Sequence, residues 1–189
     1  MIYGLFPALH GCSRGHRKTG AGFGKYSSFS ANVTTNAAAF WQGYNNISKG
    51  NPFIYFRLDS AGELKHNVPY AVCELDWHKD LAVIRRFYAR FTETPINPDE
   101  FDQTIGAPLA ILDENEIISF AIPLSFREGE TEIGAVATIP EQRNKGFCKA
   151  LISEMAYRIL GNGKAVTLTT EPSNAPMRAV AKAIGMREL

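Results

Sequence analysis

The stretch that decides the fold is Ala137-Thr138-Ile139-Pro140-Glu141-Gln142-Arg143-Asn144-Lys145-Gly146-Phe147-Cys148-Lys149-Ala150-Leu151. An apolar run over residues 133–139 predicts a strand, Pro140 ends it, and a polar turn leads into an amphipathic segment. In that segment the apolar residues recur on one face of a helix: Leu151, Ile152, Met155, Ala156, Ile159 and Leu160. The stretch therefore predicts a strand, a basic turn that contains a glycine, and a helix N-terminus.

A basic turn at a helix N-terminus favours an anion. The first backbone amides of a helix have no partner within it, and the helix dipole is positive at that end. Gly146 allows a phosphate to approach the backbone closely, while Arg143 and Lys145 add positive charge. We interpret residues 143–148 as a cradle for a diphosphate group and call them the cradle.

The cradle resembles motif A of the GNAT superfamily of acyl-CoA-dependent N-acyltransferases, whose signature is Gln/Arg-x-x-Gly-x-Gly/Ala. Cys148 stands where glycine or alanine is usual, and because cysteine is also small we expect crowding rather than loss of the site. The resemblance implies acetyl-CoA as cosubstrate, no metal, and pantetheine contacts along the preceding strand, where Thr138 is alternatively a plain strand residue. The cofactor-binding residues that it implies are Thr138, Ile139, Arg143, Asn144, Lys145, Gly146, Phe147, Cys148 and Asn174.

A second motif supports the resemblance. The run from Leu168 to Ala175, with Gly185 further on, is similar to the strand–Asn–helix–Gly ending of the family. In the family this Asn contacts the pantetheine arm, so Asn174 takes that role by resemblance; it also suits a plain helix N-cap, and the two roles are compatible. A tyrosine four residues before the glycine often acts as general acid in the family. Here the position is Ala181, so water or another group must supply the proton.

The element order from residue 78 onward is also that of the family. Periodicity and turn signals predict ααβββαβα, an antiparallel meander followed by a β–α–β crossover. The elements are helices at 78–92, from Asn97, from the cradle to 160 and at 174–184, and strands at 108–112, 117–126, 133–139 and 166–170. We therefore expect an α/β (mixed α+β) GNAT fold, with a central mixed twisted sheet flanked by helices.

A β-hairpin is predicted upstream, at residues 53–67. The family usually continues through one or two strands after the position of Gly185. We therefore expect the hairpin to extend or cover the sheet edge within a domain over residues 51–189; the alternative is a second subunit, as in a homodimer.

Residues 1–50 differ in composition. They are rich in Gly, Ser and Asn, contain no Asp or Glu, and predict a basic arm with a short helix at 36–48. The arm's basic residues are Arg14, Arg17, Lys18, Lys25 and Lys49. They allow a nucleic-acid interpretation, but without a motif it has little support.

The overall composition is that of a soluble globular protein, with 45% hydrophobic and 21% charged residues. No apolar run is long enough to span a bilayer, and the start of the chain lacks the basic region of a secretory signal. The three cysteines are far apart and odd in number, which favours reduced thiols and a cytoplasmic protein. No Cys/His cluster has metal-ligand spacing.

The chemistry of N-acylation requires a base. An alkyl amine with a pKa near 10 is only about one part in a thousand neutral at pH 7, and only the neutral form attacks a thioester. Glu132 precedes Arg143 by the spacing that resembles the catalytic glutamate of the histone-acetyltransferase branch; the alternative is a solvated carboxylate. Cys148 invites a nucleophile interpretation, because a helix N-terminus lowers a thiol pKa, but direct attack in the family favours small-residue packing.

The acceptor is expected to be an amine, of a small molecule or a peptide. Acidic residues fall on segments that flank the acceptor mouth in the family and favour a cation, although a solvated face is the alternative: Asp99, Glu100, Asp102, Glu128, Glu130 and Glu132. The rival interpretation is a CoA-binding regulatory or scaffolding module without turnover, which the alanine at position 181 supports.

Overall fold

The computed structural model describes residues 53–93 and 95–189. The predicted arm and the predicted helix at 36–48 lie outside the described residues. In chain order the elements are β1 Ile54–Leu58, β2 Cys73–Glu74, α2 Leu81–Tyr88, a 3-10 turn at Pro98–Glu100, β3 Leu109–Asp113, β4 Glu116–Leu124, β5 Glu130–Thr138, a 3-10 turn at Pro140–Gln142, α3 Phe147–Gly161, β6 Ala165–Thr170, α4 Ala175–Ala183 and β7 Arg187–Glu188.

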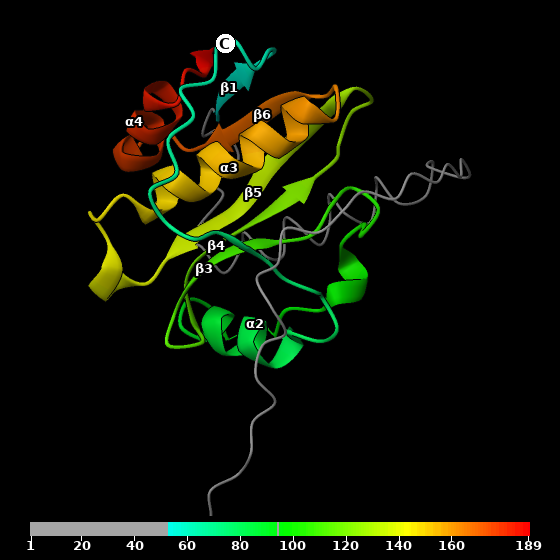
Figure 1. The fold of residues 1–189 in the computed structure, drawn as a ribbon, viewed down its shortest axis with the longest axis vertical. Helices are drawn as coiled ribbons and strands as arrows, with labels where there is room; N and C mark the ends of the chain where they lie inside the picture. The colour runs from blue at the N-terminus through cyan, green and yellow to red at the C-terminus, as the bar shows by residue number, and fades with distance from the viewer. Residues whose placement is uncertain (1–52, 94) are drawn as a thin grey trace, which may run out of the picture.

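One mixed sheet forms the centre of the described fold. Its strand order is β2-β3-β4-β5-β6-β1-β7, in which β5 and β6 are parallel and the other neighbours antiparallel. Helix α3 is the crossover between β5 and β6, and α3 and α4 lie side by side over one face of the sheet (Figure 1). Helix α2 packs against β4, where the Phe120 ring lies 5.7 Å from that of Phe87 and 5.3 Å from that of Tyr88. The expected mixed sheet flanked by helices is confirmed.

The predicted elements after residue 78 are present, with shifted ends. Helix α2 is shorter than the predicted 78–92, and buries Ile84, Phe87 and Tyr88 as one apolar face. The second predicted helix is only a 3-10 turn, but its start is as expected: the Asn97 side chain accepts a hydrogen bond from the Asp99 amide at 3.3 Å, and Pro98 follows.

The predicted hairpin at residues 53–67 is wrong. Only its first half is a strand, and residues 60–64 form a turn closed by hydrogen bonds from Glu63 to Ser60 (3.2 Å) and from Leu64 to Ala61 (3.3 Å). Strand β1 instead pairs along its whole length with β6, from Ile54 opposite Thr170 to Leu58 opposite Val166. Its other side pairs with β7. A strand from the start of the described chain thus lies between two strands from its end.

Residues 59–72, which we call the strap, run from β1 past α3 toward the other end of the sheet (Figure 1). Two hydrogen bonds fix the strap: from the Lys65 amide to the Ile184 carbonyl at 2.9 Å, and from the Asn67 amide to the buried Ser153 hydroxyl at 3.2 Å. At Gly185 (φ +101°) an added Cβ would lie 2.2 Å from the Glu63 carbonyl oxygen. Only glycine allows the strap to approach α4 this closely.

Substitutions at two adjacent residues of β1 can test whether this strand belongs to the core. Phe56 is fully buried, whereas the Tyr55 side chain on the opposite face is 49% exposed. We expect Phe56→Ala to lower the free energy of unfolding by about 3–5 kcal/mol through the cavity that it leaves. Tyr55→Ala, the matched control, should change it by less than about 1 kcal/mol. Urea denaturation measures both, and equal effects would contradict the assignment of β1 to the core.

Candidate functional site

The candidate site begins where two parallel strands separate. Strands β5 and β6 pair only at Glu130–Ala165, Thr131–Val166 and Glu132–Thr167, although they continue to Thr138 and Thr170. Beyond Glu132 the backbone groups of β5 that point toward β6 are therefore not bonded to it. We call this opening between the two strands the gap; in it, extended backbone can accept and donate hydrogen bonds.

A β-bulge shapes the β5 side of the gap. Phe120 pairs with Ala137 and Ile122 with Gly134, so β5 carries one more residue than β4 between the two pairs. Ala135 has a φ of +48°, which is uncommon for a residue other than glycine and recurs at functional sites. The bulge bends β5 where it diverges from β6. A glycine inside an apolar strand, here Gly134, was the available sequence signal for it.

The cradle lies at the carboxyl end of β5. Asn144 has a φ of +64° and Gly146, the N-cap of α3, a φ of +86°. The first helical bond joins the Ala150 amide to the Gly146 carbonyl at 3.0 Å, so the amides of residues 147–149 precede it. Left-handed residues beside a helix N-terminus form a concave backbone surface that suits an anion. The predicted cradle therefore has the expected backbone geometry.

The basic side chains of the cradle are exposed and folded onto it. Arg143 donates from Nε to the Thr138 carbonyl at 3.2 Å, and Lys145 donates from Nζ to Gln142 Oε1 at 2.7 Å. Thr138 also bonds through its hydroxyl to the fully buried Ser119 hydroxyl at 2.9 Å. Thr138 thus connects the cradle to β4. Ile139 is buried and donates its amide to the Ile118 carbonyl at 3.0 Å.

Cys148 does not have the pKa that its position in the first turn of α3 suggested. Burial raises the pKa of its thiol to about 11, because the charged thiolate is poorly solvated there. The expectation that the helix N-terminus lowers this pKa is wrong, since desolvation outweighs the helix dipole. At neutral pH Cys148 is a protonated thiol, which favours the packing role over the nucleophile role.

The second motif has the predicted local structure. Asn174 caps α4 and its side chain accepts a hydrogen bond from the Met177 amide at 3.2 Å. Ala181 is fully buried in the core. The position of the family tyrosine thus contributes packing here.

Glu132 lies at the closed end of the gap, at the last paired position of β5. Its half-buried carboxyl accepts a hydrogen bond from the Thr169 hydroxyl, and its pKa is raised, chiefly by desolvation. The nearby charge of Glu130 also raises the pKa, whereas Thr169 and Arg127 lower it. A raised pKa is what a carboxylate base needs near neutral pH, so the burial of Glu132 suits that role.

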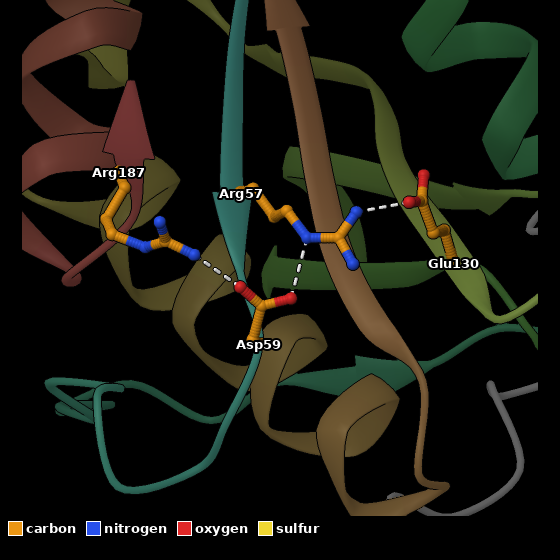
Figure 2. A network of polar contacts seen from close by, with 4 residues as sticks. All are labelled: Arg57, Asp59, Glu130 and Arg187. Atoms are coloured by element: carbon orange, nitrogen blue, oxygen red, sulfur yellow. Dashed lines mark hydrogen bonds and ion pairs between the residues drawn. The ribbon is translucent and has the colours of Figure 1, made fainter. Parts of the chain in front are cut away.

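The neighbouring carboxylate, Glu130, forms an ion pair with Arg57. Figure 2 shows the Arg57 side chain reaching from β1 across β6 to Glu130 on β5. Arg57 also donates from Nε to Asp59 at 2.6 Å, and Arg187 bonds the other oxygen of Asp59. Of the two carboxylates at the start of β5, Glu130 is therefore paired with a guanidinium group, and Glu132 has a hydroxyl partner.

Glu132 lies on β5 and the cradle follows the carboxyl end of the same strand, so the two are at opposite ends of the gap. From Thr138 to Glu132 is six residues of β5, or roughly 20 Å along an extended strand. A molecule that occupies both ends must be long, and an anionic group at the cradle end and hydrogen-bonding groups along the strand would suit it. The structure thus arranges Glu132, Thr138 and the cradle residues along one path.

Two residues at the site were not predicted from the sequence. Thr169, on the β6 wall, bonds Glu132, and it gave no signal beyond an ordinary strand position. Tyr70, in the strap, bonds the carbonyl of Lys145 at 2.6 Å, although it precedes the cradle by more than 70 residues. Its segment has no regular periodicity that would have marked it.

Comparison with known proteins agrees with this geometry. Residues 116–189, less than half of the chain, match the model of the FR47-like protein family. No curated protein matches the sequence.

Several solved structures with a similar fold are described as GNAT acetyltransferases. One from Novosphingobium aromaticivorans DSM 12444 has 17% identity and a TM-score of 0.62, over 74% of this chain and 60% of that chain. An acetyltransferase of the GNAT family from Colwellia psychrerythraea has 12% identity and a TM-score of 0.59, over 81% and 58% of the two chains. The ribosomal-protein-S18-alanine N-acetyltransferase from Escherichia coli has 20% identity and a TM-score of 0.50, over 60% and 75%.

These comparisons confirm the expected resemblance to the GNAT superfamily, and the chain has the GNAT fold. The chain spans less than two thirds of the length of the proteins from Novosphingobium and Colwellia.

The raised thiol pKa of Cys148 leads to a direct test. If the thiol only packs, Cys148→Ala should leave affinity for CoA, and any turnover of acetyl-CoA, within about twofold of wild type. Isothermal titration calorimetry and a thiol-release assay measure the two quantities. A loss of turnover by 10²-fold or more in the folded variant would restore the nucleophile interpretation.

Proposed function

We propose that this protein is an N-acetyltransferase that transfers an acetyl group from acetyl-CoA to an amine by direct attack. The observation that carries the proposal is the gap, which joins an anion-binding cradle to a half-buried carboxylate along β5. The GNAT fold of the chain supports the same chemistry at the level of the family.

Acetyl-CoA would lie along the gap. Its diphosphate would accept hydrogen bonds from the backbone amides of residues 144–148, in the turn before α3 and in its first residues. Arg143 and Lys145 would turn from their present partners toward the phosphates. The pantetheine arm would add its amides to the free edge of β5 near Thr138 and Ile139, as an extra strand does. Asn174 would contact the arm from the N-terminus of α4.

Glu132 would be the base. It accepts a proton from the ammonium form of the acceptor, and the neutral amine then attacks the carbonyl carbon of the thioester. The new C–N bond forms as the C–S bond breaks, and the electron pair leaves with the sulfur as the CoA thiolate. The acylated nitrogen loses its remaining extra proton to water, which leaves a neutral amide. Because position 181 is alanine, we propose that water protonates the thiolate. Desolvation of Glu132 favours this role because it raises the affinity of the carboxylate for a proton.

The acceptor would be an amine of a small molecule or a peptide. Its cationic form is favoured by the carboxylates near the closed end of the gap, which include Glu128 and Glu132. Glu130 contributes less to this attraction because Arg57 offsets its charge.

A regulatory CoA-binding module is the second candidate, and the buried Ala181 in place of the family tyrosine is the observation that favours it. A thiol-release assay with acetyl-CoA and pooled amines separates the two. Release of CoA above the rate of hydrolysis supports the enzyme, and binding without release supports the module.

We also propose a cytoplasmic location for the protein. No helix within residues 53–93 and 95–189 is long and apolar enough to cross a membrane. Cys148 is a free thiol, which agrees with the proposed cytoplasmic location. A second subunit is not needed beside β6, because β1 pairs with that strand. The proposal needs no metal and no nucleic acid.

The cradle is tested by Gly146→Asp. The added carboxylate would repel the diphosphate and fill space that glycine leaves free, so CoA binding should be lost in calorimetry. Gly163→Asp is the matched control: Gly163 has a similar positive φ of +74° at a turn beyond α3, and an added Cβ there has nothing within 4 Å. It should bind CoA as wild type does. Unchanged affinity in folded Gly146→Asp would refute the cradle.

The base is tested by Glu132→Gln. Turnover should fall by roughly 10²-fold or more while CoA affinity changes little, because the loss is of proton transfer alone. Glu128→Gln, which removes an exposed carboxylate four residues before Glu132, is the control: kcat should stay within about twofold, and only the KM for a cationic acceptor should rise.

The pH dependence adds a second readout for Glu132. The base acts when deprotonated, and its raised pKa places the acidic limb of kcat/KM above the ordinary glutamate value of 4.5. Activity should therefore rise with pH through this limb, and the limb should disappear in Glu132→Gln. A limb that persists in the variant belongs to another group.

A further inference from the structure

Tyr70, at the end of the strap, contacts the cradle from outside the motif. Its hydroxyl donates to the Lys145 carbonyl at 2.6 Å, and its ring lies 4.5 Å from that of Phe147, the first residue of α3. A Cβ placed on Gly146 would lie 4.0 Å from the Tyr70 ring. The half-buried tyrosine thus bonds Lys145 and packs on Phe147, the two residues on either side of Gly146.

The hydrogen bond from Tyr70 orients one particular peptide group. The Lys145 carbonyl and the Gly146 amide belong to the same planar trans peptide, in which the C=O and N–H bonds point in opposite directions. Because the carbonyl is held toward Tyr70, the Gly146 N–H is held toward the other side. Gly146 accepts both signs of φ, so this peptide would otherwise rotate readily about its glycine side.

We propose that Tyr70 is a positioning residue that presets the Gly146 amide for the cofactor diphosphate. This inference rests on the proposed binding of acetyl-CoA in the cradle. Tyr70 acts through the peptide of Lys145 and Gly146 and has no part in proton transfer at Glu132.

The strap makes this contact rigid before any ligand binds. It is fixed to α4 through the Lys65 amide and to α3 through the Asn67 amide, three residues before Tyr70. A cradle whose peptide is already oriented loses less conformational entropy on binding than a free loop does. The N-terminal part of the described chain thereby contributes to a site whose motif lies in the C-terminal half.

Tyr70→Phe removes the hydroxyl and keeps the ring that packs on Phe147. Losing one neutral hydrogen bond should weaken CoA binding by about threefold to tenfold. Pantetheine, which has no diphosphate, should bind with unchanged affinity. The matched control is Tyr157→Phe on α3, where the ring is 53% exposed and stacks on His66 at 4.7 Å, away from the cradle.

Calorimetry of full-length wild type and both variants with CoA and with pantetheine gives the outcome. Weaker CoA binding in Tyr70→Phe alone, with unchanged pantetheine affinity and melting temperature, supports the proposal. CoA affinity within twofold of wild type, or an equal loss for both ligands, overturns it. If the wild-type protein itself binds no CoA, the proposed function fails, and that result is distinct from an unaffected Tyr70→Phe.

Discussion

The early end of the pairing between β5 and β6 is the constraint on which the site depends. Strand β5 remains bonded to β4 on its other side, and the bulge at Ala135 bends it without releasing it. The gap is thus a separation of two supported strands rather than a frayed edge. Because α3 packs against both strands, the opening is backed by the same helix whose N-terminus forms the cradle. Helix α3 therefore fixes the position of the cradle relative to β5 and to the gap.

Strand β1 makes this separation possible. A strand that leaves one neighbour early needs another, and β6 is bonded to β1 over all five residues of β1. Arg57 then joins β1 to Glu130 across β6, next to the position where the direct pairing stops. A partly exposed ion pair of this kind contributes little free energy. Its position at the closed end of the gap is what gives it a structural role.

Local signals predicted the parts of the site that are local in sequence. Pro140, Gly146 and Asn174 end or cap their elements as expected, because each acts on its own few residues. The turn after β1 was predicted correctly. The hairpin prediction failed because the partner of β1 is β6, which lies about 110 residues further along the chain. The prediction of a lowered thiol pKa at Cys148 failed for a related reason. The helix dipole is a local effect, whereas the burial that raises the pKa comes from the whole fold. Tyr70 depends on such a distant contact as well.

The placement of β1 also sets the order in which the protein is completed during synthesis. Strands β2 to β5 pair with their sequence neighbours and pack against α3, so this half of the sheet needs no residue beyond 161 for these contacts. Strand β1 is made first but must wait for β6, roughly 5 to 20 s later at ordinary rates of translation. During that time the side chains of Phe56 and Leu58, which are fully buried in the folded protein, have no core to enter. The anchor of the strap at Ile184 arrives later still, so the nascent chain gains its complete cradle only after residue 184 has been made.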